Sequence, residues 1–216
     1  MNILLTGSSG QLGTELYPLL LPLGQVTLVD RTAGPHNTIQ QDLKNLHQFE
    51  ILLNRLRPDL IVNTAAYTAV DQAENDHATA FRLNAELPAC MARWCKTNQR
   101  QLLHYSTDYV FDGAGQHAYV ETDPTGPINV YGDSKLAGEL AIKTSGCKHI
   151  ILRTSWVYST HGNNFLLTML RLARQRPELG VVSDQTGCLT WARNLARASL
   201  QVLQTMQDER AWEENT

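Results

Sequence analysis

Short apolar runs alternate along this chain with longer segments in which apolar residues recur at helical spacing. The runs predict short strands buried on both faces: 3–6, 25–29, 60–63, 102–105, 150–152 and 180–182. The longer segments predict helices: 11–21, 43–56, 76–97, 130–143, 164–174 and 191–207. Alternation of this kind predicts an α/β fold, a doubly wound and Rossmann-like parallel sheet with helices on both faces.

Several expected helix ends carry the residue types that such ends favour. Asp42 and Asn163 stand before helical segments, where a short polar side chain can accept a hydrogen bond from a free backbone N–H group. Gly24 and Gly146 stand just before expected strands, where glycine suits the left-handed residue that ends a helix. These residues predict one boundary for each of four helices.

Size and charge narrow the classes of protein to which the chain can belong. Its 216 residues can bury one substantial core, and a hydrophobic share of 43% is ordinary for a globular protein. A formal net charge of −3 gives no electrostatic reason to expect nucleic acid or an anionic membrane as a partner. The opening apolar run lacks a basic leader, and no apolar stretch approaches the length of a bilayer span. We therefore expect a cytoplasmic protein.

The residue types that ligate metals are scattered. Cys90, Cys95, Cys147 and Cys188 show no C-x-x-C spacing, which predicts reduced thiols rather than disulfides or a zinc site. The seven histidines include no pair four residues apart. We expect no metal site built by this chain.

Three glycines lie between the first expected strand and the first expected helix. Gly7, Gly10 and Gly13 form the pattern G-x-x-G-x-x-G. In dinucleotide-binding folds the first glycine allows a tight turn, the second lets the backbone approach a pyrophosphate, and the third lets the helix pack on the strand. The glycines could serve only the strand–helix junction, but the flanking strand, helix and acidic residue favour a dinucleotide site.

The second expected strand ends in an acidic residue. Asp30 could accept hydrogen bonds from the adenosine ribose of NAD(H), whereas the adjacent Arg31 could hold the 2′-phosphate of NADP(H). Asp30 could equally be a surface turn residue. Two further groups of residues lie at or beyond expected strand ends, where ligands bind in open α/β sheets. These candidate cofactor contacts are Asp42, Leu43, Ala65, Ala66, Tyr67 and Thr68.

A tyrosine and a lysine stand four residues apart in the segment 130–143. On a helix, Tyr131 and Lys135 would share one face. A cation at Lys135 would favour the ionised form of a phenol, whose ordinary pKa is about 10. Thr107, after the fourth expected strand, could hydrogen-bond the reacting oxygen, with Ser106 as the second candidate. Joined to the glycine turn, these residues favour coupled hydride and proton transfer over an ordinary helix-surface pair.

One connection is unusually long. The stretch 111–129 is rich in Gly, Asp and Pro, and structureless connections of this length in compact domains are usually functional. It joins a strand end to the helix that carries Tyr131. We expect it to form the wall or lid of the substrate site.

Six strings along the chain carry a resemblance to a known family. They are T-G-S-S-G-Q-L-G at 6–13, N-T-A-A-Y-T-A-V-D at 63–71, S-T-D-Y-V-F-D-G at 106–113, Y-G-D-S-K at 131–135, R-T-S-W-V-Y at 153–158 and D-Q-T-G-C-L-T at 184–190. In this order they resemble the dTDP-4-dehydrorhamnose reductase family of the extended short-chain dehydrogenase/reductase superfamily. The resemblance implies NADPH- or NADH-dependent reduction of the C4 keto group of dTDP-4-dehydro-L-rhamnose to dTDP-L-rhamnose.

The resemblance also implies roles for single residues. Tyr131 would donate a proton to the C4 carbonyl oxygen with help from Thr107, while Lys135 would hold the nicotinamide ribose. Asp108 and Trp156 would contact the sugar nucleotide, although Trp156 could equally be a core aromatic residue. The residues that would line the cofactor are Gly10, Gln11, Leu12, Asp30, Asp42, Leu43, Ala66, Tyr67, Thr68 and Tyr105.

Two positions bear on the reaction and on the sugar contacts. Related sugar-nucleotide dehydratases carry a Glu directly after Thr-Asp, where this chain has Tyr109, which cannot serve as a carboxylate base. Reduction is therefore favoured over dehydration. The family usually has Pro where this chain has Leu189. Because Pro fixes φ, the shape of that loop is expected to differ.

Family members continue for several dozen residues beyond the length of this chain. We expect a dinucleotide-binding Rossmann domain over 1–150 and a partial substrate-binding segment over 151–216 that interleaves with the core, so that the substrate-binding lobe is incomplete. The alternative is a catalytically impaired or regulatory nucleotide-binding module of the same family. The amphipathic segment 76–97 could cover the sheet or pair with a second copy, which leaves a homodimer open.

Overall fold

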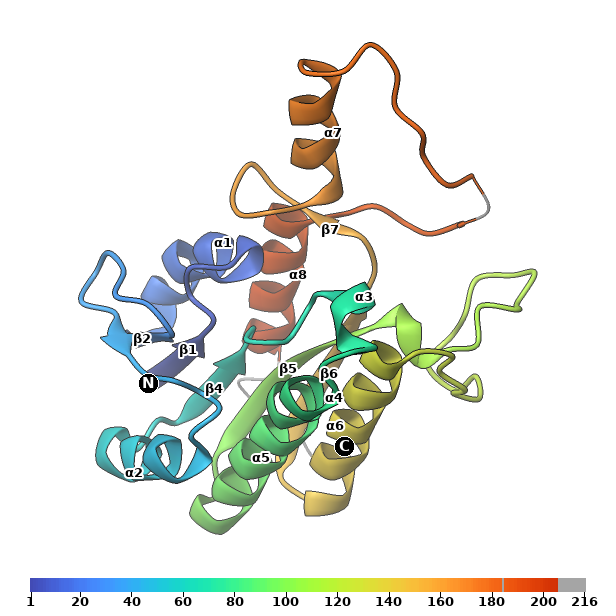
Figure 1. The fold of residues 1–216 in the computed structure, drawn as a ribbon. Helices are drawn as coiled ribbons and strands as arrows, with labels where there is room; N and C mark the ends of the chain where they lie inside the picture. Colours follow the sequence, from blue (N-terminus) through green and yellow to red (C-terminus); the bar gives the residue numbers. More distant parts are fainter. Residues whose placement is uncertain (184, 206–216) are drawn as a thin grey trace.

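The main sheet of the computed structural model, which describes residues 1–183 and 185–205, has six parallel strands in the order β3-β2-β1-β4-β5-β6. Their bounds are β1 Asn2–Thr6, β2 Gln25–Asp30, β3 Ile39–Gln40, β4 Leu60–Asn63, β5 Gln101–Thr107 and β6 Lys148–Thr154. This strand order is that of the doubly wound dinucleotide-binding folds (Figure 1). The predicted fold class is confirmed.

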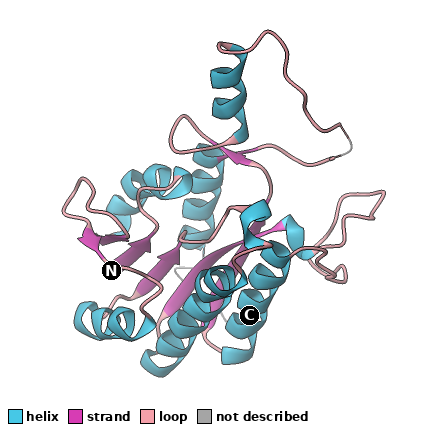
Figure 2. Cartoon of the chain, viewed as in Figure 1, coloured by secondary structure: helices cyan, strands magenta, loops and turns pink. Residues whose placement is uncertain are grey.

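Helices connect the strands and cover the sheet (Figure 2). They are α1 Gln11–Leu20, α2 Leu46–Leu56, α3 Val70–Ala73, α4 His77–Phe81, α5 Leu87–Asn98, α6 Val130–Ser145, α7 Phe165–Ala173 and α8 Ala192–Thr205. Three short helical turns accompany them: η1 Leu21–Leu23, η2 Arg82–Glu86 and η3 Asp108–Val110.

Side chains that alternate along each strand build two separate cores. Leu4 of β1 packs into a core with α2, α5 and α6 on one face of the sheet. Its neighbours Ile3 and Leu5 pack with α1 and α8 on the other face. Because both faces are covered, the strands are apolar at almost every position, which is why they were recognisable as continuous runs.

A second region lies between β6 and α8. It contains α7 and a two-stranded parallel sheet of β7 Val157–Tyr158 and β8 Thr190–Trp191. Figure 1 shows α7 standing away from the main sheet, and none of its residues is buried.

The expected strand at 180–182 is wrong. Val181 and Val182 form no strand, and they are 54% and 66% exposed. The chain pairs with β7 further on, at Thr190–Trp191. A short apolar run lacks any signal for whether a partner strand is available, which explains the error. The two-residue strand β3 was not expected, because it is too short to show alternation.

The expected helix 76–97 begins and ends close to the predicted residues but is not continuous. Asp76 caps it by accepting a hydrogen bond from the Thr79 N–H at 3.2 Å. The five residues of η2 then form a π-helical turn between α4 and α5. Hydrophobic spacing does not distinguish such a turn from an ordinary helix.

Two expected N-caps are also wrong. The side chain of Asn45, not Asp42, accepts from the Gln48 N–H at 3.1 Å and starts α2. The side chain of Asn164, not Asn163, accepts from the Leu167 N–H at 2.9 Å and starts α7. In each case a neighbouring polar residue fits the same cap. The expected helix-ending glycines are confirmed: Gly24 follows η1, and Gly146 ends α6 at φ +66°.

The division of the chain at residue 150 stays a prediction, since β6 spans that position and α8 packs against the core on the α1 face. The last two positions of the expected helix 191–207, and the first residue of the string 184–190, lie outside the described residues. Across 1–183 and 185–205, no helix combines the length and the apolar character needed to cross a membrane.

Candidate active site

The glycine turn leaves a free helix N-terminus at the carboxyl edge of the sheet. Gly7 adopts φ +69°, and a Cβ atom there would lie 2.7 Å from the Ala65 nitrogen. A Cβ atom at Gly13 would overlap the Gly7 carbonyl oxygen. Gly10 precedes α1 without a side-chain cap, so the first N–H groups of α1, beginning at Gln11 and Leu12, are available to an anion. These constraints fit a pyrophosphate held by backbone.

Asp30, the last residue of β2, forms hydrogen bonds with this turn. Its carboxylate accepts hydrogen bonds from the Ser9 N–H and hydroxyl, both at 2.8 Å, and from the Arg31 N–H at 2.7 Å. The turn after β3 lies beside the end of β2, and in this turn the Asp42 carboxylate accepts a hydrogen bond from the Lys44 N–H. The side chain of Leu43 packs into the core, 7% exposed. Asp30 therefore stands beside the glycine turn, where the ribose contact was expected.

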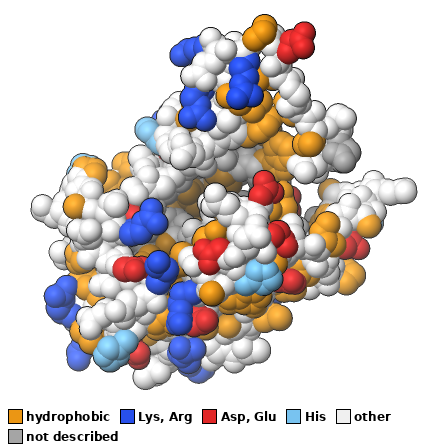
Figure 3. Space-filling view, in the orientation of Figure 1, with side chains coloured by type: hydrophobic (Ala, Val, Ile, Leu, Met, Phe, Trp, Pro, Cys, Tyr) orange, Lys and Arg blue, Asp and Glu red, His pale blue; other side chains and the backbone are white. Residues whose placement is uncertain are grey.

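Gln11 ties the glycine turn to the second region. Its side-chain nitrogen donates to the Val157 carbonyl at 3.4 Å, and its oxygen accepts from the Asn164 side chain at 2.9 Å. These two hydrogen bonds hold the start of α7 close to the glycine turn, at the carboxyl edge of the sheet. Figure 3 shows the surface hollowed between this upper region and the body of the molecule, with hydrophobic side chains beside the hollow.

The catalytic candidates converge where β5 ends and α6 begins. The Asn129 side chain caps α6 by accepting from the Gly132 N–H at 2.7 Å. Tyr131 follows in the first turn of α6 and, like Tyr67, packs against a small buried cluster. The Tyr131 and Tyr109 rings meet edge to face, with their centroids 5.6 Å apart. Thr107, the last residue of β5, is 5% exposed and lies close enough to Tyr131 to lower the pKa of its phenol.

The environment of Tyr131 favours its protonated form. Burial raises the pKa of the phenol to about 12 and outweighs the lowering by the Thr107 hydrogen bond, while the charges of Asp108 and Tyr109 raise it further. This direction is opposite to the one expected from a cation at Lys135. A phenol that stays protonated at neutral pH is in the correct state to donate a proton.

Lys135 is buried beneath this edge of the sheet, 2% exposed. Its ammonium group donates to the Tyr105 carbonyl at 2.6 Å, and burial lowers its pKa to about 8 against an opposing effect of Glu139. The Tyr105 side chain points the other way, since its hydroxyl donates to Ser199 of α8 at 2.6 Å. Only the carbonyl of Tyr105 therefore reaches the candidate lysine.

Asp108 and Trp156, the residues expected to contact the sugar, are linked to Thr107 by hydrogen bonds and by the chain. The Asp108 carboxylate accepts from Thr107 at 3.1 Å and from Ser155 at 2.7 Å. Trp156 follows in the left-handed region at φ +46°, which is uncommon for a bulky residue. Its ring meets Phe165 of α7 at 6.1 Å and is partly exposed rather than enclosed in a core. The hydrogen bond from Ser155 thus links Asp108 to the segment that carries Trp156.

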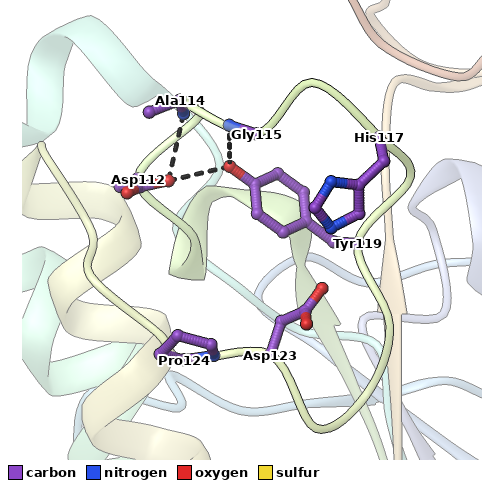
Figure 4. Close-up of a pocket in the computed structure, with 7 residues that line it drawn as sticks. All are labelled: Asp112, Ala114, Gly115, His117, Tyr119, Asp123 and Pro124. Carbon is purple, nitrogen blue, oxygen red and sulfur yellow. Dashed lines mark hydrogen bonds between the residues drawn. The ribbon is translucent and has the colours of Figure 1, made fainter.

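The long connection 111–129 folds around its own hollow (Figure 4). The Tyr119 hydroxyl donates to Asp112 at 2.8 Å and accepts from the Gly115 N–H at 2.8 Å. Phe111 stacks on Tyr119 with ring centroids 4.3 Å apart. Loop residues alone line this hollow of about 270 Å³, so a role as wall or lid stays a prediction.

A buried asparagine missing from the expected site connects three of its parts. Asn84 lies in the π-helical turn η2 and is fully buried. Its side chain accepts from the Tyr67 N–H at 2.8 Å and donates at 3.0 Å both to the Tyr67 carbonyl and to Ser134 of α6. A π-helical turn often marks a functional site. The only signal in the sequence was one polar residue in an otherwise helical pattern.

Three of the four cysteines belong to the core and not to this site. Cys90, Cys95 and Cys147 are buried free thiols, Cys188 is exposed, and burial raises the pKa of the three buried ones. In the part of the chain that the structure describes, no three His, Cys, Asp or Glu side chains gather as a metal site would need.

Known proteins match the chain over nearly its whole length. A family model described as the RmlD substrate binding domain matches residues 1–214. The dTDP-4-dehydrorhamnose reductase of Burkholderia thailandensis is 46% identical over 98% of this chain and 68% of that protein. The chain spans about two thirds of the length of the curated relatives that it matches.

Solved structures agree in fold. A dTDP-4-dehydrorhamnose reductase from Clostridium acetobutylicum superposes with a TM-score of 0.87 at 36% identity, covering 95% of this chain and 71% of that one. The enzyme of the same name from Bacillus anthracis, solved in complex with NADP, superposes with a TM-score of 0.86 at 36% identity over 94% of this chain and 71% of that one.

Proposed function

The chain belongs to the dTDP-4-dehydrorhamnose reductase family, and on that premise we propose that it reduces the C4 keto group of dTDP-4-dehydro-L-rhamnose with NADPH or NADH. The observation that carries the proposal is the proximity of Tyr131 and Thr107 at the carboxyl edge of the sheet, the edge at which α1 also presents its free N-terminus. A proton donor and a nucleotide cradle at one edge are what reduction of a ketone requires.

The residues of the glycine turn fit a dinucleotide. The backbone of Gly10, Gln11 and Leu12 would hold the pyrophosphate at the start of α1. Asp30 would face the adenosine ribose, and Ala65, Ala66, Tyr67 and Thr68 follow the adjacent strand β4. Bound NADPH or NADH would supply the hydride for C4. The B. anthracis relative solved with NADP supports this class of cofactor.

The protein itself supplies the proton and holds the reacting oxygen. Tyr131 donates its phenolic proton to the C4 oxygen as hydride arrives at C4, so that no free alkoxide forms. The Thr107 hydroxyl, which donates to Asp108 in this structure, would turn its proton to the same oxygen. Lys135 would hold the nicotinamide ribose, while Asp108 and Trp156 would contact the sugar nucleotide. Tyr109 packs against Tyr131, where a dehydratase would need a carboxylate base.

A turnover assay with the nucleotide sugar tests this function. We expect wild-type protein to oxidise NADPH or NADH when dTDP-4-dehydro-L-rhamnose is added. Tyr131→Phe removes the proton donor and should lower kcat by about 10²–10⁴-fold, with unchanged affinity for the reduced cofactor. Tyr17→Phe is the matched control, because Tyr17 of α1 contacts His36 outside the candidate site.

Two results would count against the proposal. Equal turnover in wild type and Tyr131→Phe would remove the tyrosine from the chemistry. Normal cofactor binding without any turnover by the wild type would instead favour the alternative of a regulatory nucleotide-binding module.

A further inference from the structure

A row of buried polar side chains crosses the centre of the sheet beneath α6. Thr6 of β1 pairs in register with Asn63 of β4, and Asn63 pairs with His104 of β5. Their exposed fractions are 0%, 1% and 0%. Polar groups so deeply buried need hydrogen-bond partners. The partners of each side chain therefore show which of its atoms donates a hydrogen bond and which accepts one.

The orientation of the Asn63 amide is fixed by its neighbours. Its side-chain oxygen accepts from the Thr6 hydroxyl at 2.8 Å and from the Ala65 backbone N–H at 3.2 Å. A backbone N–H can only donate, so the amide group cannot be turned round without setting two donors against each other. The Asn63 nitrogen therefore faces His104 Nδ1, at 3.0 Å, as a donor.

This amide selects one tautomer of His104. Because Nδ1 accepts from Asn63, the neutral ring carries its proton on Nε2. Burial, and then the charge of Lys135, hold the pKa of His104 well below its ordinary value, so the ring is neutral. Its Nε2–H faces the Lys135 nitrogen at 3.4 Å.

The two protonation states of Lys135 differ in how well they fit this arrangement. A neutral amine can donate one N–H to the Tyr105 carbonyl at 2.6 Å, accept from His104 with its lone pair, and keep one N–H for a ligand. An ammonium has three donors and no lone pair, so it offers no acceptor to the Nε2–H of His104.

We propose that His104 is a positioning residue for Lys135: its Nε2–H, fixed by Asn63, faces the Lys135 nitrogen and favours the amine over the ammonium form. The consequence for catalysis rests on the proposed function: reduction should respond to the protonation of Lys135 on the mildly alkaline side of neutrality. Lys135 would then hold the cofactor ribose through an N–H group and could gain or lose a proton there.

None of the other titratable groups that face Lys135 favours its amine form as His104 does. Glu139, one turn further along α6, is the group that favours the ammonium form. Its charge is already matched by Arg153 of β6 at 2.7 Å and by Lys143 at 3.6 Å. From β5, the facing groups are the His104 ring and the Tyr105 carbonyl. Tyr131, in the preceding turn of α6, is a neutral phenol at these pH values.

Carbon-13 NMR of the lysine side chains tests the inference without any need for turnover. The chain has five lysines, so the Cε signals are few, and Lys135→Arg assigns the one of interest. We expect Lys135 to titrate near pH 8 in the wild type. His104→Asn keeps an acceptor for Asn63 but removes the N–H that faces Lys135, and should raise this titration by about one pH unit or more.

His149→Asn is the matched control. His149 is also a buried histidine, on β6, where its Nδ1 bonds the Cys147 carbonyl instead of the Asn63–Lys135 row. The Lys135 titration should not move in this variant. An unchanged Lys135 titration in His104→Asn would overturn the proposal.

A second measurement uses only the wild type, and it decides the question even if His104→Asn does not fold. Nitrogen-15 spectra should report His104 as the neutral Nε2–H tautomer, and an Nδ1–H tautomer would overturn the proposal. Since neither NMR measurement involves substrate, a protein that titrates as expected but fails to turn over would contradict the proposed function and support the role of His104.

Discussion

The two helices that border the candidate site, α6 and α7, are held in very different ways. α6 buries Ser134, Lys135 and Glu139 against the sheet and η2. α7 buries no residue, and its apolar side chains Phe165 and Leu170 remain 52% and 51% exposed. The difference shows that α6, which carries the proposed proton donor, is fixed by the same core that stabilises the fold. α7, beside the residues proposed to contact the sugar, is held by hydrogen bonds and a few ring contacts.

Ion pairs repeat this contrast. In the α6 region the Glu139 carboxylate is fully buried and binds Arg153, which is 18% exposed, through two bonds of 2.9 and 2.7 Å. At the base of the second region, Glu15 binds Arg193, which is 46% exposed, at 3.0 Å. Removing one partner of a buried pair strands a charge, whereas an exposed partner is solvated by water.

The largest expected effect is on Glu139→Gln, which leaves Arg153 without its carboxylate. We expect a loss of about 3 kcal/mol in the free energy of unfolding, measured by urea denaturation at neutral pH. The matched variant of the second pair, Glu15→Gln, leaves Arg193, which is 46% exposed and solvated by water, and should cost less than about 1 kcal/mol. Similar losses for the two variants would contradict the proposed difference between the regions.

The same pair predicts a pH dependence. Burial alone would raise the pKa of Glu139, but the hydrogen bonds and charge of Arg153 outweigh it and hold the pKa below its ordinary value. A carboxyl with a depressed pKa stabilises the fold above the unfolded pKa of about 4.3, and this contribution is lost as the pH falls through the lower folded value. The stability difference between wild type and Glu139→Gln should therefore shrink in acid.

A smaller effect is expected from adding one methyl group to a glycine in each region. A Cβ atom at Gly138 of α6 would overlap the backbone oxygen of Asn84, whereas at Gly180 no atom lies within 4 Å. Gly138→Ala should therefore cost about 1–3 kcal/mol, and Gly180→Ala less than about 0.5 kcal/mol. Thermal unfolding of the two variants measures this. A Gly138→Ala protein as stable as the wild type would show that η2 and α6 are not closely packed.

The smallest expected effect concerns two asparagines with the same local role. Asn129 caps α6 and Asn164 caps α7, with bonds of 2.7 and 2.9 Å. Replacing a cap by Ala costs about 1 kcal/mol. For Asn129→Ala we expect the loss in the global free energy of unfolding. For Asn164→Ala we expect faster amide hydrogen exchange confined to α7, because local opening of this helix exposes no core. Global destabilisation by Asn164→Ala would contradict this.

Much of the candidate site could be predicted from the sequence, because its signals are local. The glycine turn needs glycine where a Cβ atom would meet backbone, and the pair Tyr131 and Lys135 needs only helical spacing. Thr107 was found because it ends an apolar run, and ligands bind at the carboxyl ends of parallel strands. Asn84 left almost no signal, since its partners Tyr67 and Ser134 lie 17 and 50 residues away.

The sequence by itself determined the alternation of the longer strands and helices, the parallel sheet and the placing of the candidate catalytic residues at its carboxyl edge. The spacing of apolar residues along the chain follows directly from which faces of its strands and helices are buried. Only the tertiary structure decided that Thr6, Asn63 and His104 form one polar row, and that the Tyr105 side chain faces α8 rather than Lys135. The physical reason is that strand register joins residues distant in the chain, and no local pattern records which partner will satisfy a buried polar group.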